Sequence, residues 1–254
     1  MTDVKVPSHA MVLAAGLGLR MRPLTLSRPK PLLTVAGRTL LDHALDRLAA
    51  AGVATAVVNS HYLGEMIGAQ LAGRTEPEII LSPEPEALET GGGIRKALPY
   101  LGQKPFVSAN ADVLWLDGPV PAVRRLARAW DAAAMDAVLL LVPMARAHGY
   151  DGPGDFEMDE AGRLSRRRDG TAASFVFAGV QILTPALFAD TPEGAFSTNL
   201  VWDRALPAGR LHGIVHDGEW FHVGTPDALQ WTDDWFRNPD NGQGLHGTGG
   251  LLVR

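Results

Sequence analysis

Short apolar runs alternate with segments of helical periodicity through the first half of the chain. Residues 10–15 are uniformly apolar and predict a buried strand, whereas residues 39–51 carry apolar side chains at helical spacing. Thr39 followed by Asp42 resembles a capping box at the start of that helix. Further strands are expected at 53–59, 78–81, 105–110 and 136–143, and further helices at 62–71 and 119–133. This alternation predicts an α/β fold with a doubly wound, mostly parallel sheet covered by helices on both faces.

The pattern changes near residue 145. Residues 163–169 are rich in charge, and three apolar runs predict strands at 175–183, 211–215 and 220–223. We expect these strands to form a smaller sheet packed against the carboxyl edge of the first half. The whole chain, 1–254, is expected to be one domain with a core at about 8–145, a second part at about 146–236 and an irregular tail at 237–254.

Composition narrows the classes of protein that this sequence fits. The 254 residues suffice for a sizeable core, and the absence of cysteine excludes disulfides, thiolate nucleophiles and cysteine-based zinc sites. A formal net charge of -5 argues against nucleic acid as a partner. No apolar run approaches the roughly 18 residues that cross a membrane. We therefore expect a cytoplasmic protein with neither a membrane nor a nucleic-acid partner.

One cationic segment stands out in this acidic chain. No Asp or Glu occurs between Asp3 and Asp42, and the first predicted strand leads into a turn at residues 16–18 that contains two glycines. Four cations follow: Arg20, Arg22, Arg28 and Lys30. Glycine lets the backbone approach a ligand with its N–H groups exposed, and the cations can neutralise phosphate. The segment predicts a site for a small polyanion, with a solvated basic loop as the alternative.

A second glycine cluster, Glu89-Thr90-Gly91-Gly92-Gly93, precedes a helical pattern at residues 94–98. Three consecutive glycines leave no side chain in the way, so a flat base or a ribose can lie against the backbone. Thr90 and the backbone amides can then bind its edge. The alternative is a flexible turn before a helix.

Two polar residues are expected where strands end. Asp112 follows the predicted strand at 105–110, and ligands of open α/β sheets gather outside the carboxyl ends of strands. A carboxylate there is well placed to hold Mg²⁺, although an N-capping role would also explain it. Thr225 before Pro226 predicts the start of a helix. That start places His222 at another junction between a strand and a loop.

The four features described above are the cationic segment, the triple glycine, Asp112 and the junction at His222. In this order they resemble the sugar-1-phosphate nucleotidyltransferases, and the likeness spans roughly residues 10–235. Within that family the sequence is most similar to the compact bacterial type that uridylylates N-acetylmuramate 1-phosphate in peptidoglycan recycling. The segments that carry the resemblance are 13–25, 29–31, 82–84, 88–93, 110–112, 154–156, 177–179 and 223–225. The resemblance implies a Rossmann-like sheet, in which the first part binds nucleotide and the second is a small sugar-binding subdomain.

The resemblance also implies a reaction and a set of site residues. A sugar 1-phosphate would attack the α-phosphorus of a nucleoside triphosphate, with Mg²⁺ as cofactor and pyrophosphate as the leaving group. Arg20 would clamp the β- and γ-phosphates, Lys30 would bridge the two reacting phosphates, and Asp112 would hold the metal. The implied nucleotide-binding residues are Ala14, Ala15, Gly16, Gly18, Glu89, Thr90, Gly91 and Gly92, and the implied sugar-binding residues are Asn110, Asp155 and Gly179.

The chain departs from the family pattern at three places. Ala111 stands where the family has glycine between Asn and Asp, and its methyl group is small. His222 replaces the usual second metal-binding aspartate, and imidazole is a poor ligand for Mg²⁺. We predict that Asp112, phosphates and water hold the metal, while His222 binds it through water or touches phosphate. The Glu-Lys-Pro element of larger members is absent, and the arginines at 166–168 are its candidate substitute.

Two alternatives to uridylyl transfer stay open at the level of sequence. A guanylyltransferase acting on mannose or heptose 1-phosphate is the nearest enzymatic alternative, because the choice of base depends on loop geometry. A non-catalytic nucleotide-sugar sensor would explain His222. A nicotinamide-dependent reductase is disfavoured, because Met21 occupies a glycine or alanine position of its fingerprint. The sequence leaves the nucleotide, the sugar and the choice between monomer and small homo-oligomer undetermined.

Overall fold

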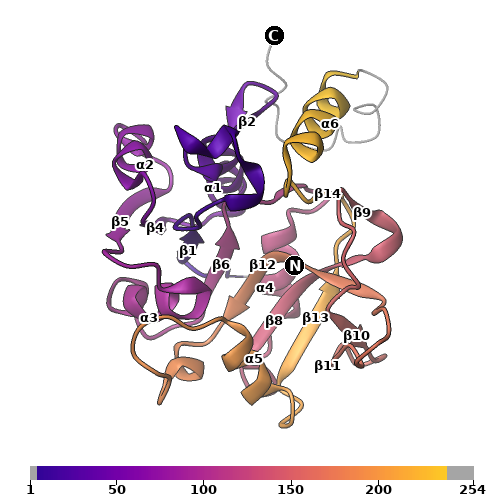
Figure 1. Cartoon of the computed structure of the whole chain (residues 1–254). Helices are drawn as coiled ribbons and strands as arrows, with labels where there is room; N and C mark the ends of the chain where they lie inside the picture. The colour runs from indigo at the N-terminus through magenta and orange to yellow at the C-terminus, as the bar shows by residue number, and fades with distance from the viewer. Residues whose placement is uncertain (1–4, 239–254) are drawn as a thin grey trace.

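The computed structural model describes residues 5–238, in which a central nine-stranded sheet lies between two layers of helices (Figure 1). The strand order is β11-β10-β12-β6-β1-β4-β5, with β8 beside β12 and β13 beside β8. Parallel pairing joins β1 to β4 and β6, β4 to β5, and β8 to β13, whereas β12 is antiparallel to β6 and β8. The strands are β1 (His9–Leu13), β4 (Thr55–Ser60), β5 (Glu78–Pro83), β6 (Phe106–Asn110), β8 (Ala137–Pro143), β10 (Phe156–Met158), β11 (Leu164–Arg166), β12 (Phe175–Leu183) and β13 (Leu211–Val215). The predicted doubly wound, mostly parallel sheet is confirmed.

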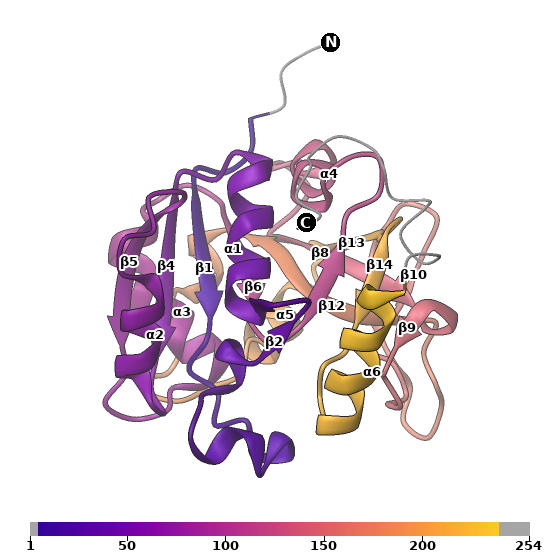
Figure 2. The same cartoon turned by 90° about the horizontal axis from the view of Figure 1, so that it is seen from above.

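Helices cover both faces of this sheet (Figure 2). Because side chains alternate along a strand, Ala10 and Val12 of β1 join the core on one face and Met11 joins the core on the other. The first face is covered by α1 (Leu40–Ala51), α2 (Gly64–Leu71) and α4 (Ala122–Ala129), and the second by α3 (Glu89–Leu101) and α5 (Asn199–Ala205). Between residues 5 and 238, no helix has the length and apolar character needed to span a membrane.

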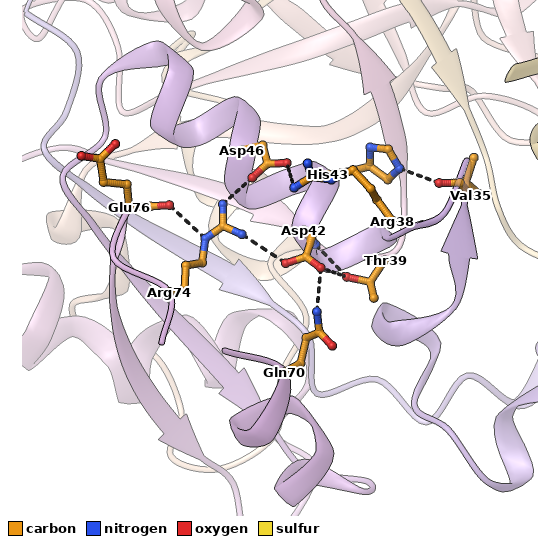
Figure 3. A network of polar contacts seen from close by, with 9 residues as sticks. All are labelled: Val35, Arg38, Thr39, Asp42, His43, Asp46, Gln70, Arg74 and Glu76. Atoms are coloured by element: carbon orange, nitrogen blue, oxygen red, sulfur yellow. Dashed lines mark hydrogen bonds and ion pairs between the residues drawn. The ribbon is translucent and has the colours of Figure 1, made fainter. Parts of the chain in front are cut away.

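A polar network fixes the start of α1 and the segment that precedes it (Figure 3). Thr39 Oγ1 accepts the N–H of Asp42 at 3.0 Å, as the sequence predicted. Arg74 then bridges Asp42 and Asp46, at 3.1 and 2.5 Å. Burial lowers the pKa of His43, and its Nε2–H donates to the backbone oxygen of Val35 at 2.9 Å. The network thereby anchors the chain just beyond Lys30 to the rigid helix layer.

The expected smaller sheet exists, but its composition differs from the prediction. It comprises β7 (Leu114–Leu116), β14 (Glu219–Phe221) and β9 (Ala147–His148). The strands β12 and β13 belong to the main sheet instead, so the prediction was wrong for them. Most of β12 is buried, which is typical of an interior strand between two neighbours. The helix α6 (Pro226–Arg237) packs on the small sheet, and the predicted tail beyond residue 238 lies outside the described residues.

Candidate functional site

A cavity of about 570 Å³ lies where β1 and β6 end. Leu13 of β1 and Asn110 of β6 are paired in register at these carboxyl ends. In the sheet, β1 lies between β4, which follows it in the chain, and β6. Such a switch in strand order is where open α/β sheets bind ligands. The predicted site residues that line the cavity are Ala14, Ala15, Gly16, Gly18, Arg20, Lys30, Glu89, Thr90, Asn110 and Asp112.

The glycine loop is folded back onto the segment that carries Lys30. Gly18 adopts a left-handed conformation with φ +61°, and an added Cβ would lie 3.0 Å from the Cβ of Lys30. The hydroxyl of Thr25 donates to the backbone oxygen of Gly18 at 2.9 Å. Arg20 and Lys30 consequently reach the same cavity, whereas Arg22 and Arg28 are exposed and do not line it.

Lys30 and Asp112 form an ion pair at this cavity, with 2.9 Å between Nζ and Oδ2. The lysine side chain is only 7% exposed, while that of the aspartate is 43% exposed. The ammonium group is therefore held in place by its surroundings, and the carboxylate keeps open space on its solvent side. A fixed cation next to an accessible carboxylate can bind a phosphate and a hard cation side by side.

Two polar residues of the cavity wall were missed by the sequence analysis. Asn59, at the end of β4, accepts the N–H of Ala14 at 2.6 Å and donates to Oε1 of Glu84 at 2.7 Å. The second oxygen of Glu84 accepts the N–H of Leu88 at 3.1 Å. Asn59 and Glu84 therefore tie the glycine loop to the start of α3. A polar residue at the end of an apolar strand was the signal available for Asn59.

Gly91 and Gly92 lie in the first turn of α3 and do not line the cavity. Their N–H groups donate to the backbone oxygen of Phe196 at 2.8 and 3.1 Å. An added Cβ would lie 2.4 Å from the Phe196 ring at Gly91 and 2.2 Å from the oxygen of Gly194 at Gly92. The helical pattern was expected to begin at residue 94, but α3 already begins at Glu89, so the alternative of a flexible turn is wrong as well. At these two positions glycine permits close packing of the loop before α5.

The three predicted sugar-binding residues lie on or next to three neighbouring strands: Asn110 in β6, Gly179 in β12 and Asp155 just before β10. Asn110 lines the main cavity. Gly179 lies in an irregularity of β12 with φ +81°, where an added Cβ would be 3.2 Å from the Cβ of Asn110. Asp155 lies outside the main cavity and lines a second cavity of about 270 Å³. Its Oδ2 accepts the N–H of Phe177 at 2.8 Å, which fixes the side chain beside β12.

His222 follows β14 and does not line the main cavity, although Gly224 does. Its ring stacks on Trp220, with 6.0 Å between centroids, and meets Tyr150 edge-on at 5.7 Å. Burial and then the charge of Lys30 lower the pKa of His222, which favours the neutral imidazole. Within residues 5–238, no three His, Asp or Glu side chains are grouped as a metal site.

Comparison with known proteins gives a consistent result. Residues 10–150 match the family model described as "MobA-like NTP transferase domain". The chain is 45% identical over 229 residues to N-acetylmuramate alpha-1-phosphate uridylyltransferase of Caulobacter vibrioides, covering 88% of this chain and 95% of that protein. The protein of that name from Neisseria meningitidis is 38% identical and is covered to 95%, over 87% of this chain.

The fold also matches solved structures. The inositol-1-phosphate CTP transferase from T. maritima superposes with a TM-score of 0.75 at 17% identity, over 98% of this chain and all of that chain. At this identity the match supports the nucleotide-diphospho-sugar transferase fold and nothing finer.

Proposed function

Since this chain belongs to the MobA-like NTP transferase family and is a nucleotidyltransferase, we propose that it transfers the uridylyl group of UTP to N-acetylmuramate 1-phosphate. The products would be the nucleotide sugar and pyrophosphate. The observation that carries the proposal is the Lys30–Asp112 pair at a cavity that Arg20 also lines. The choice of uridylyl and of this sugar is supported by the two relatives of that name.

Different site residues neutralise the charges of different phosphates. We assign the β- and γ-phosphates to Arg20 and the glycine-loop N–H groups, and the α-phosphate to the Lys30 ammonium. An oxygen of the sugar phosphate attacks the α-phosphorus, and the bond to the bridging oxygen of pyrophosphate breaks with its electrons leaving on that oxygen. Lys30 stabilises the charge that builds up on both reacting phosphates, as is usual in phosphoryl and nucleotidyl transfer.

The residues present fit a divalent metal with a single protein carboxylate. Mg²⁺ prefers oxygen ligands and is commonly bound by one or two carboxylates together with substrate phosphates and water. Asp112 offers an accessible carboxylate, whereas a neutral imidazole at His222 suits softer metals. When bound, the metal would neutralise phosphate charge and polarise the α-phosphate; Asp112 would hold it.

Pyrophosphate release across a matrix of nucleotides and sugars tests this function. UTP, GTP, CTP, ATP and dTTP would each be combined with N-acetylmuramate, mannose, heptose and other sugar 1-phosphates, with Mg²⁺ and with EDTA. We expect the highest kcat/KM for UTP with N-acetylmuramate 1-phosphate, and no turnover in EDTA. Preference for GTP would instead identify a guanylyltransferase, and absence of any turnover a sensor. A cytoplasmic location and a monomeric or small homo-oligomeric state stay predictions.

The replacement His222→Asp should preserve or raise Mg²⁺-dependent turnover. The new carboxylate would lie two residues before Gly224, which lines the main cavity, and would offer an oxygen ligand near that side of the site, so the apparent KM for Mg²⁺ should fall. The measurement is kcat as a function of Mg²⁺ concentration, with His222→Asn as a control of similar size but without charge. The control should not strengthen Mg²⁺ binding. Total loss of activity in His222→Asp at an unchanged Tm would contradict this assignment.

A further inference from the structure

A second cavity of about 270 Å³ lies beside the main one and has no part in the chemistry described above. It is bordered by β11, by the loop that leads into β10 and by α5, and all three lie in the lower half of Figure 1. Its lining residues are Gly154, Asp155, Arg166, Arg167, Asn199 and Asp203.

Two short paths connect this second cavity to the main one. On the helix side, the N–H of Thr198 donates to Oγ1 of Thr90 at 2.9 Å, and Thr90 lines the main cavity while the next residue, Asn199, lines the second. Along the sheet, Gly179 lies against Asn110 and Phe177 binds Asp155. Phe177 and Gly179 are two residues apart in β12, so only a short stretch of this strand separates the two cavities.

Two of the four charged residues that line the second cavity form an ion pair with each other. Arg166 donates to Oδ1 of Asp203 from Nε and from a terminal nitrogen, at 3.0 and 2.8 Å, and its guanidinium lies 4.9 Å from the Phe156 ring centroid. One carboxylate oxygen of Asp155 is taken by the N–H of Phe177. Within residues 5–238, the Arg166–Asp203 pair therefore leaves the carboxylate of Asp155 and one positive charge of the lining outside any ion pair.

That charge is on Arg167. One terminal nitrogen donates to the backbone oxygens of Thr171 and Arg168, at 2.9 and 3.4 Å. Among residues 5–238 no carboxylate lies within ion-pair distance of it. A guanidinium held through one nitrogen keeps its other N–H groups for a planar, two-oxygen acceptor. The carboxylate of Asp155 lines the same cavity, so a singly charged carboxylate fits better here than a doubly charged phosphate.

We propose that Arg167 determines specificity by binding a carboxylate on the sugar, so that the second cavity selects an acidic sugar 1-phosphate over a neutral one. This inference rests on the proposed function, in which the lactyl ether of N-acetylmuramate supplies that carboxylate. With the 1-phosphate at Lys30 and the ring beside Asn110 and Gly179, the ether extends toward Arg167. The open oxygen of Asp155 accepts a sugar hydroxyl next to it.

Paired substrates and paired variants test the assignment. The substrates are N-acetylmuramate 1-phosphate and its methyl ester, which removes the charge and keeps the shape. In Arg167→Gln, kcat/KM for the acid should fall about 10- to 100-fold, mainly through KM, because a charge-assisted hydrogen-bonded pair is lost. Values for the ester and the KM for UTP should stay within about threefold. A matched control is Arg128→Gln, because Arg128 is an exposed arginine of α4 that lines neither cavity, and this variant should leave both substrates unchanged. Arg167→Lys should recover part of the preference for the acid.

The outcomes separate this inference from the proposed function. Equal losses for acid and ester in Arg167→Gln, or no loss for the acid, would overturn the role of Arg167 while uridylyl transfer stands. Wild-type protein that uses acid and ester equally well would do the same. Turnover of neutral sugar 1-phosphates with none of the acid would overturn the proposed function and the inference with it.

Discussion

Replacing Lys30 with methionine should lower kcat by about 10²- to 10³-fold, the usual cost of removing one fixed group that stabilises charge in a transition state. The side chain is 7% exposed and its ammonium lies 2.9 Å from Asp112, so its position is set before substrate binds. Methionine has a similar length and fills the same space without the charge. Steady-state kcat and the KM for UTP, measured by pyrophosphate release, report the change.

The Tm of Lys30→Met should not fall together with its kcat. The variant removes a buried charge from a pair whose other member, Asp112, is 43% exposed and can be rehydrated, so Tm should change little or rise. Arg28→Met is the matched control, because Arg28 is an exposed cation of the same segment that does not line the cavity. It should keep kcat within about twofold. A Lys30→Met protein with nearly full turnover, or one whose loss follows a fall in Tm, would contradict the assignment.

The arrangement of the sheet was largely predictable from local pattern. Residues 10–15 are uniformly apolar and residues 39–51 carry apolar side chains at helical spacing, and both elements form within two residues of the predicted bounds. The error concerned β12 and β13, and the apolar run of β12 is compatible either with the small sheet or with the main one. Its place is decided by pairing with β6 and β8, which are distant in sequence, and periodicity carries no information on partners.

The cationic half of the site was predictable because its chemistry is concentrated in one segment. Gly18, Arg20 and Lys30 follow each other within thirteen residues, and all three line the cavity. The link between Lys30 and Asp112 spans 82 positions and appears only in the folded chain. Asn59 and Glu84 act through backbone N–H groups, which leave no mark in the sequence.

The role of the triple glycine could not be predicted, because the sequence does not distinguish a glycine that makes room for a ligand from one that makes room for another part of the chain. We expect Gly92→Ala to lower the free energy of unfolding by about 1–3 kcal/mol and Tm by about 2–10 °C. Its Cβ would lie 2.2 Å from the backbone oxygen of Gly194, so the loop or the start of α3 must move. The N–H of Gly92 donates to Phe196 across the same contact, and this bond would be strained as well.

Gly68→Ala is the control that separates packing from helix propensity. Gly68 also lies in a helix, α2, but there an added Cβ meets only Leu81 Cδ1 at 3.5 Å, an ordinary contact. Alanine should therefore stabilise that helix by about 0.5–1 kcal/mol. Thermal unfolding of the two variants should give shifts of opposite sign. If Gly92→Ala instead kept its Tm and raised the KM for UTP, the added methyl group would interfere with the nucleotide and not with the packing of the loop. Gly92 would then serve nucleotide binding, as the sequence alone suggested.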